Sequence, residues 1–171
     1  MEFDKVIENR CSIRDYDDRE VSENDLEKIV HAGHRAPIAK GLYENMAITV
    51  ISDKNLIKEI EDEARAIKGK KDYKPLYKAP VLIIVSAKDD HESKREDTAC
   101  IIENMTLKAT ELNLGSCYIR GIFERFDKDA KFIKKLNLDE DFYPVHGLIL
   151  GHTKDELRGR VHHIKTNYIK A

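Results

Sequence analysis

Near its amino terminus the chain reads Arg10-Cys11-Ser12-Ile13-Arg14, with an arginine on either side of a serine. In an extended segment alternate residues share a side, so both arginines and the serine would face the same way. Guanidinium forks and a hydroxyl suit the acceptor oxygens of a phosphate monoester. A second basic pair, Arg158 and Arg160, lies near the other end of the chain. These residues therefore indicate a phosphate site, with a solvated, charged helix end as the alternative.

The composition limits the classes of protein to which the chain can belong. Its 171 residues are 41% hydrophobic and 36% charged, which is typical of one globular domain. A net charge of −2 gives no overall field for nucleic acid or anionic membrane, and no apolar run approaches the roughly 20 residues of a membrane span. The three cysteines lack a C-x-x-C spacing and the start does not resemble a signal peptide. We therefore expect reduced thiols in a cytoplasmic protein.

Hydrophobic patterning predicts an α+β domain that spans residues 1–171. Ser22 and Asp25 resemble a capping box that begins a helix, and Pro37 is expected to close it. The other expected helices cover 2–10, with Phe3, Val6 and Ile7 inward, and 54–67, 97–113 and 128–136. The 97–113 helix is expected to be central and to stop at Gly115. Strands are expected at 46–51, 81–87, 116–120 and 145–150, the second of them buried on both faces.

Common catalytic motifs are absent from the sequence. It contains neither G-x-G-x-x-G nor G-x-x-x-x-G-K-[ST], neither H-E-x-x-H nor G-x-S-x-G. The histidines are expected to be surface or capping residues, so no metal site is predicted. Cys11 and Cys117 have no histidine or acid near them in sequence, which favours inert thiols. Anion-binding residues without a catalytic constellation indicate chemistry brought by a phosphorylated cofactor.

Five segments, in order over nearly the whole chain, resemble the FMN-dependent nitroreductase family. They are residues 10–14 with Tyr16 and Val21, residues 31–40, residues 77–85, residues 113–121, and residues 148–152 with the later Arg158 and Arg160. The resemblance implies a central mixed, mostly antiparallel sheet flanked by helices, with a carboxy-terminal tail that embraces a dimer partner. Val161, Ile164, Tyr168 and Ile169 would supply the apolar contacts of that tail.

The resemblance also assigns residues to FMN. Arg10, Cys11, Ser12 and Arg14 would hold the phosphate end, and Arg158 and Arg160 would close on it from the tail. Tyr118, Ile119, Arg120 and Gly121 would lie along the isoalloxazine. The segment that contains Pro37, Ile38, Ala39 and Gly41 would reach the flavin of the partner subunit. A lysine of the loop at 68–74 is a candidate cation near flavin N1, with a solvated turn as the alternative.

Some positions depart from the family pattern. Ile38 replaces a serine or threonine, Tyr43-Glu44-Asn45 replaces Q-P-W, and Arg120 replaces an acid. These changes leave the phosphate residues intact but alter the expected substrate pocket. Arg120 either lines that pocket, where it would favour acceptors with a carboxylate or nitro group, or points into solvent or pairs with Glu124.

The function that the resemblance implies is that of a homodimeric FMN-dependent NAD(P)H oxidoreductase. It would reduce small electron-poor acceptors, nitroaromatic or quinone-like, by a ping-pong hydride mechanism centred on the flavin, without a catalytic side chain. One alternative is a protein that stores or senses FMN without NAD(P)H turnover. Another is a dimer that binds no flavin.

Overall fold

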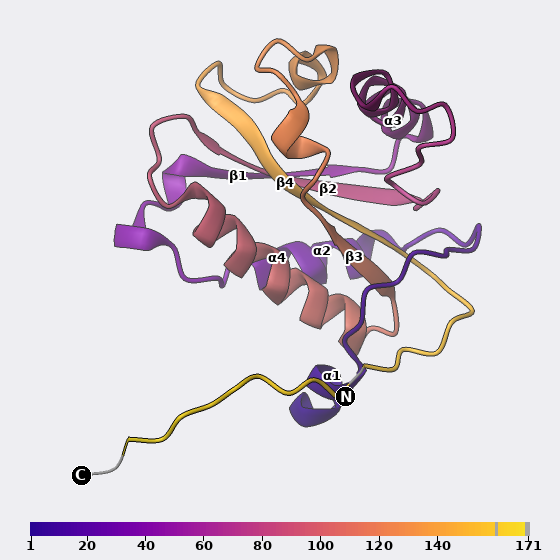
Figure 1. Cartoon of the computed structure of the whole chain (residues 1–171), viewed down its shortest axis with the longest axis vertical. Helices are drawn as coiled ribbons and strands as arrows, with labels where there is room; N and C mark the ends of the chain where they lie inside the picture. Colours follow the sequence, from indigo (N-terminus) through magenta and orange to yellow (C-terminus); the bar gives the residue numbers. More distant parts are fainter. Residues whose placement is uncertain (160, 170–171) are drawn as a thin grey trace.

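A four-stranded antiparallel sheet organises the fold in the computed structural model, which describes residues 1–159 and 161–169 (Figure 1). Its strands are β1 (Met46–Ile51), β2 (Val81–Lys88), β3 (Gly115–Ile119) and β4 (Phe142–Gly151). The strand order is β1-β2-β4-β3, so β1 and β3 form the edges. On the outer side of β3, an isolated parallel bridge joins Ser12 to Ser116 of that strand. The predicted α+β class with a mostly antiparallel sheet is confirmed.

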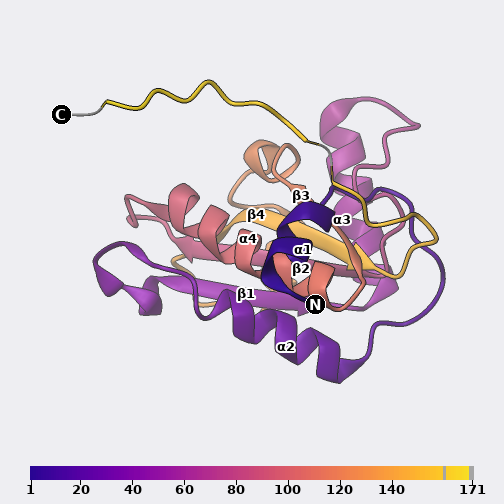
Figure 2. The same cartoon turned by 90° about the horizontal axis from the view of Figure 1, so that it is seen from below.

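Helices cover both faces of the sheet (Figures 1 and 2). On one face lies α4 (Lys94–Glu111), with α2 (Glu23–Gly33) packed beside it. On the other face lie α3 (Lys54–Lys68) and the 3-10 turns η3 (Phe123–Arg125) and η4 (Lys131–Lys135). The short α1 (Phe3–Asn9) packs against α4. Two further 3-10 turns, η1 (Ala39–Gly41) and η2 (Tyr43–Asn45), precede β1.

Burial on both faces explains the composition of β2. Every residue from Val81 to Ala87 is buried, because alternate side chains enter the two cores on opposite sides of the sheet. Leu82 and Ile84 pack towards α3, whereas Ile83 and Val85 pack towards α2 and α4. The predicted doubly covered strand is confirmed.

Local chemistry fixes the starts of two helices. The Ser22 hydroxyl accepts a hydrogen bond from the backbone N–H of Asp25, as the capping pattern predicts. Asp53 caps α3 in the same way through the N–H of Asn55. The end of α2 departs from the prediction, because the helix stops at Gly33 and the chain turns before Pro37 is reached.

Gly115 does not end the central helix as predicted. Helix α4 runs from Lys94 to Glu111, three residues earlier at its start than predicted, and Asn113 makes the left-handed turn after it with φ +57°. Gly115 is instead the first residue of β3, where a Cβ would lie 2.8 Å from the side chain of Ile13. The glycine is required by the close approach of residues 11–13.

The helix predicted over 2–10 is present as α1, but two of its predicted inward residues are exposed, and the surface helix predicted over 128–136 is wrong. In α1 only Val6 is buried, and Phe3 and Ile7 are 67% and 50% exposed. The stretch expected as a surface helix over 128–136 is the 3-10 turn η4, which is anchored by buried Phe132. In the first case the short helix packs against α4 and buries Val6 alone. In the second case, the turn packs against the sheet because the Phe132 side chain is buried in the core.

The chain after β4 leaves the sheet and returns beside α1 (Figure 1). Residues 161–169 then extend away from the body of the molecule in both views (Figures 1 and 2). Val161, Ile164, Tyr168 and Ile169 are between 83% and 99% exposed. Within the described residues, no helix has the length and apolar character needed to cross a bilayer.

Candidate functional site

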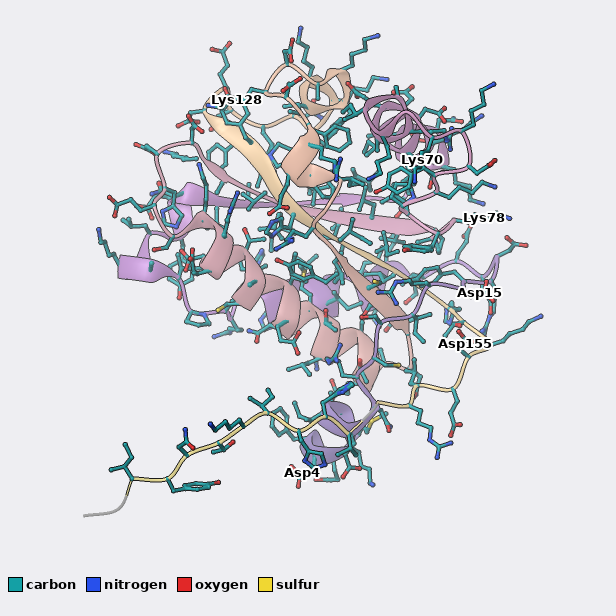
Figure 3. All side chains as sticks on the ribbon, in the orientation of Figure 1. Asp4, Asp15, Lys70, Lys78, Lys128 and Asp155 are labelled. Atoms are coloured by element: carbon teal, nitrogen blue, oxygen red, sulfur yellow. The ribbon has the colours of Figure 1, made fainter. Side chains whose placement is uncertain are left out.

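A cavity of about 610 Å³ opens between residues 10–14 and the tail. The residues that line it are Arg10, Cys11, Ser12, Ile13, Arg14, Asp155, Glu156, Arg158 and His162. Asp155, labelled in Figure 3, lies on the part of the tail that faces residues 10–14. The structure thus brings together basic residues from both ends of the chain, as the sequence predicts. Arg160 lies outside the described residues.

Pairing with β3 holds residues 11–13 extended. The N–H of Ile13 donates a hydrogen bond of 2.8 Å to the carbonyl of Ser116, and Ser12 forms a parallel bridge with the same residue. Ile13 is buried against Gly115, whereas Ser12 and Arg14 are exposed. This alternation puts the serine and arginine side chains on the side away from the core, as the sequence predicts.

Tyr16 supports the same segment from behind. Its hydroxyl donates a hydrogen bond of 2.7 Å to the carbonyl of Ile13. Burial raises the pKa of Tyr16 well above its usual range, so the hydroxyl keeps its proton and remains a donor. The Ile13 backbone is therefore held at both its N–H and its carbonyl, which fixes the directions of the residues on either side.

Among the described residues, the guanidinium groups that line the cavity have no acidic group closer than 3.9 Å. Arg10 Nε lies 3.9 Å from Glu103 Oε1, and Arg158 Nη1 lies 3.9 Å from Glu156 Oε2. The Arg14 guanidinium lies over the ring of Tyr77, 5.8 Å from its centroid. Charge-assisted hydrogen bonds are about 2.7–2.9 Å long, so these arginines keep donors for another anion. The contact of Arg14 with Tyr77 was not expected from the sequence, because it joins segments that are far apart in the chain.

A hydrogen bond from the tail closes the cavity. The N–H of Gly159 donates to the carbonyl of Glu8 at 2.9 Å. A Cβ at Gly159 would lie 2.1 Å from that oxygen, so only glycine fits this approach. The contact places Arg158 beside the segment that follows α1. Asp155, Glu156 and His162 also line the cavity and were not predicted, and their only signal in the sequence is their closeness to Arg158.

Cys117 lies behind the cavity and is not suited to act as a nucleophile. Burial raises the pKa of its thiol, and the opposing influence of Arg14 and Arg10 is smaller. Cys11 and Cys100 are partly buried, and all three cysteines are free, as the sequence predicts.

The end of β3 presents the second group of predicted residues. Ile119 is buried, whereas Arg120 and Gly121 are exposed. Arg120 Nε lies 3.4 Å from Glu124 Oε2, so of the two orientations considered above the structure shows the ion pair. At about 3.3 Å per residue, Arg120 lies about 13 Å along the strand from Ser116, which adjoins the arginine-lined cavity.

The segment from Pro37 to Gly41 lies elsewhere. Ile38 lines a separate apolar hollow of about 330 Å³ beside α2 and β1. The N–H of Ala39 donates to both carboxylate oxygens of Asp97 at 3.1 and 3.2 Å. Asp97 is itself buried with His91, whose Nε2 lies 2.6 Å from its Oδ2. Within one chain, these residues do not join the cavity formed by residues 10–14 and the tail.

A family model and a known relative each match most of the chain. The family model described as the nitroreductase family matches residues 7–152. The chain belongs to the nitroreductase family. This member is 30% identical over 157 residues to an Archaeoglobus fulgidus protein described as an NADH dehydrogenase/NAD(P)H nitroreductase, over 89% of this chain and 86% of the relative. This member of the family is therefore an oxidoreductase, as the sequence resemblance predicts.

Solved structures extend the comparison to the whole nitroreductase chain. A Bacteroides fragilis nitroreductase with bound FMN is 27% identical, with a TM-score of 0.81 over 100% of this chain and 96% of that one. A Desulfitobacterium hafniense nitroreductase shares the fold at 24% identity, with a TM-score of 0.87 over 99% of both chains.

Proposed function

We propose that the protein is an FMN-dependent NAD(P)H oxidoreductase that reduces small electron-poor acceptors. The observation that carries the proposal is the cavity in which Arg10, Arg14 and Arg158 meet without a close anionic partner. A phosphate monoester would supply the negative charge and the acceptor oxygens with which these guanidinium groups can pair. The FMN bound in the Bacteroides fragilis nitroreductase carries such a group.

The residues present would fit FMN from the arginine-lined cavity along strand β3. Arg10, Ser12, Arg14 and Arg158 would hold the phosphate, with the Cys11 backbone between them. Beta strand β3 leads from Ser116, beside this cavity, to the exposed backbone at Arg120 and Gly121, which would lie against the ring. Tyr118 and Ile119 complete that part of the proposed site. Arg160, outside the described residues, is proposed to close on the phosphate with Arg158.

The protein supplies position and charge rather than a side-chain nucleophile. FMN, when bound, would supply the redox chemistry of a ping-pong cycle between NAD(P)H and the acceptor. The arginines fix one end of the cofactor, and the rigid edge of β3 fixes the other. Cys117 is kept protonated by burial and takes no part.

We infer that the working form is a homodimer. Pro37, Ile38, Ala39 and Gly41 lie apart from the arginine-lined cavity of their own chain, so they would contribute to a flavin site only from a second copy. The tail beyond Arg160 exposes Val161, Ile164, Tyr168 and Ile169, and apolar residues of this kind are usually covered by a partner. A homodimer in which the tail embraces the partner satisfies both observations.

Mixing the yellow protein with NADH or NADPH in the absence of oxygen tests the proposed reaction. Rapid loss of the flavin absorbance is expected, followed by its return when a nitroaromatic or a quinone is added. A flavin band that does not change with either donor would instead identify a protein that stores or senses FMN. Colourless protein whose Tm does not rise with added FMN would contradict flavin binding itself.

A further inference from the structure

A small hollow with a buried histidine wall lies between the start of α4 and β4. Its volume is about 130 Å³, and Lys94, Arg95 and His146 are among the residues that line it. It is separate from the arginine-lined cavity, but Tyr118 and Glu124 connect it to the end of β3.

His146, which lines this hollow, has one ring nitrogen without a hydrogen-bond partner among the described residues. The residue is 4% exposed, and its Nδ1 lies 2.7 Å from the hydroxyl of Tyr118. Its Nε2 is buried and has no hydrogen-bond partner among the described residues. Glu124 Oε1 is the acidic group that faces Nε2, at 4.0 Å, which is too long for a hydrogen bond.

The surroundings determine which nitrogen of His146 carries the proton. Burial lowers the pKa of His146, and Arg95 and Arg120 act in the same direction against Glu124, so the imidazole is neutral near pH 7. Burial raises the pKa of Tyr118, so its hydroxyl stays protonated and can donate to Nδ1. A lone pair on Nε2 would face the Glu124 carboxylate. The proton therefore belongs on Nε2, which makes this atom a donor.

Two cations, Lys94 and Arg95, and one carboxylate, that of Glu124, line the same hollow. Arg95 is exposed and has no ion-pair partner among the described residues, whereas neighbouring Lys94 pairs with Asp89. Both cations lie in the first turn of α4, where the helix dipole also favours an anion, and where Glu96 and Asp97 supply two carboxylates of their own. The opposing charge of Glu124 is partly offset by its pair with Arg120.

We propose that this hollow is an oxyanion subsite in which Arg95 and the Nε2–H of His146 bind a carboxylate or phosphate group of a substrate. The inference rests on the proposed function, which places the flavin ring beside Arg120 and Gly121. Tyr118, two residues earlier on β3, is bonded directly to the wall of the subsite. The group bound there belongs either to the acceptor, as a carboxylate, or to NADPH, as its ribose phosphate. Arg95 thus takes the selective role considered above for Arg120.

Binding of benzoate to FMN-saturated protein tests the subsite without turnover. Calorimetric titration should give a tighter Kd for benzoate than for uncharged benzamide. Arg95→Ala should weaken benzoate about tenfold or more and leave benzamide unchanged, and Arg95→Lys should fall between the two. Arg125→Ala removes the same charge from exposed η3 outside the hollow and should change neither ligand. An unchanged Kd for benzoate in Arg95→Ala would overturn the subsite.

Two kinetic ratios then identify the source of the oxyanion. If the acceptor carries it, Arg95→Ala lowers the ratio of kcat/KM for 4-nitrobenzoate over nitrobenzene and leaves the preference for NADPH over NADH unchanged. If the dinucleotide carries it, only the second ratio falls. Constancy of both ratios would contradict the subsite. Protein that proves unable to bind flavin would overturn the proposed function. The benzoate titration, repeated on that flavin-free protein with and without Arg95→Ala, would still decide the subsite.

Discussion

Gly159 donates its N–H to the carbonyl of Glu8 at 2.9 Å, and this bond joins the tail to the segment that follows α1. The two residues are far apart in the sequence but determine the same cavity. Because a Cβ at position 159 would lie 2.1 Å from the Glu8 oxygen, the contact depends on the absence of a side chain.

Gly159→Ala is therefore expected to displace the tail and its arginines from the cavity. The affinity for FMN should fall about tenfold, which corresponds to the loss of one charge-assisted contact. The Tm without flavin should change little, because residues 154–156 and 161–169 of the tail are exposed. Fluorescence titration with FMN measures the effect. Lys154→Ala, an exposed change on the same tail, is the control, and equal affinity in the two variants would contradict the role of this bond.

Arg10→Ala should weaken FMN binding by about tenfold to a hundredfold, because a charge-assisted hydrogen bond contributes roughly 1.5–3 kcal/mol. Glu103, the acid that faces Arg10, lies 3.9 Å from it, so little native stability should be lost. Equilibrium titration gives the affinity, and Arg125→Ala serves as the control that removes an exposed arginine elsewhere. Wild-type affinity in Arg10→Ala would remove this residue from the phosphate site.

Deletion of residues 161–171 tests the proposed embrace of the partner. The described part of this segment exposes Val161, Ile164, Tyr168 and Ile169. The shortened chain should therefore lose the apolar surface that the proposed dimer interface would bury. Sedimentation should show a weaker dimer, and absorbance should show less flavin per chain. A truncated protein that remains dimeric and fully loaded would rule out the embrace.

His146 should make the stability of the protein depend on pH. Its pKa is lowered by burial in the folded state, so below the usual value of 6.5 the unfolded chain binds the extra proton more readily. The contribution of His146 to the free energy of unfolding therefore decreases as the pH falls below 6.5. His146→Gln should flatten the change in Tm between about pH 7 and pH 5. Parallel curves for the wild type and the variant would contradict the neutral, buried imidazole.

Local and short-range signals gave much of the fold. The doubly covered strand β2 and the cap at Ser22 were predictable because each depends on residues that are close together in the sequence. In β2 the signal is a continuous apolar run, and in the cap it is a serine three residues before the N–H that it accepts from. The role of Gly115 was not predictable, since it depends on the approach of Ile13 from a segment about a hundred residues earlier. The exposure of Phe3 and Ile7 likewise depends on what packs beside α1.

The candidate site divides in the same way. The alternation at residues 10–14 followed from the sequence, because an extended strand fixes the side on which each residue lies. The contact of Arg14 with Tyr77 and the bond between Tyr118 and His146 did not, since each joins distant segments. The sequence also left open whether the Arg120 side chain enters the pocket, because its pairing with Glu124 depends on where the turn η3 lies.

The comparison of FMN with riboflavin tests the central claim most directly, because the two ligands differ only in the phosphate. If Arg10, Arg14 and Arg158 form a phosphate site, FMN should bind about a hundredfold or more tightly than riboflavin, and Arg14→Ala should reduce that ratio. Equal affinities for the two ligands in the wild-type protein would contradict the account.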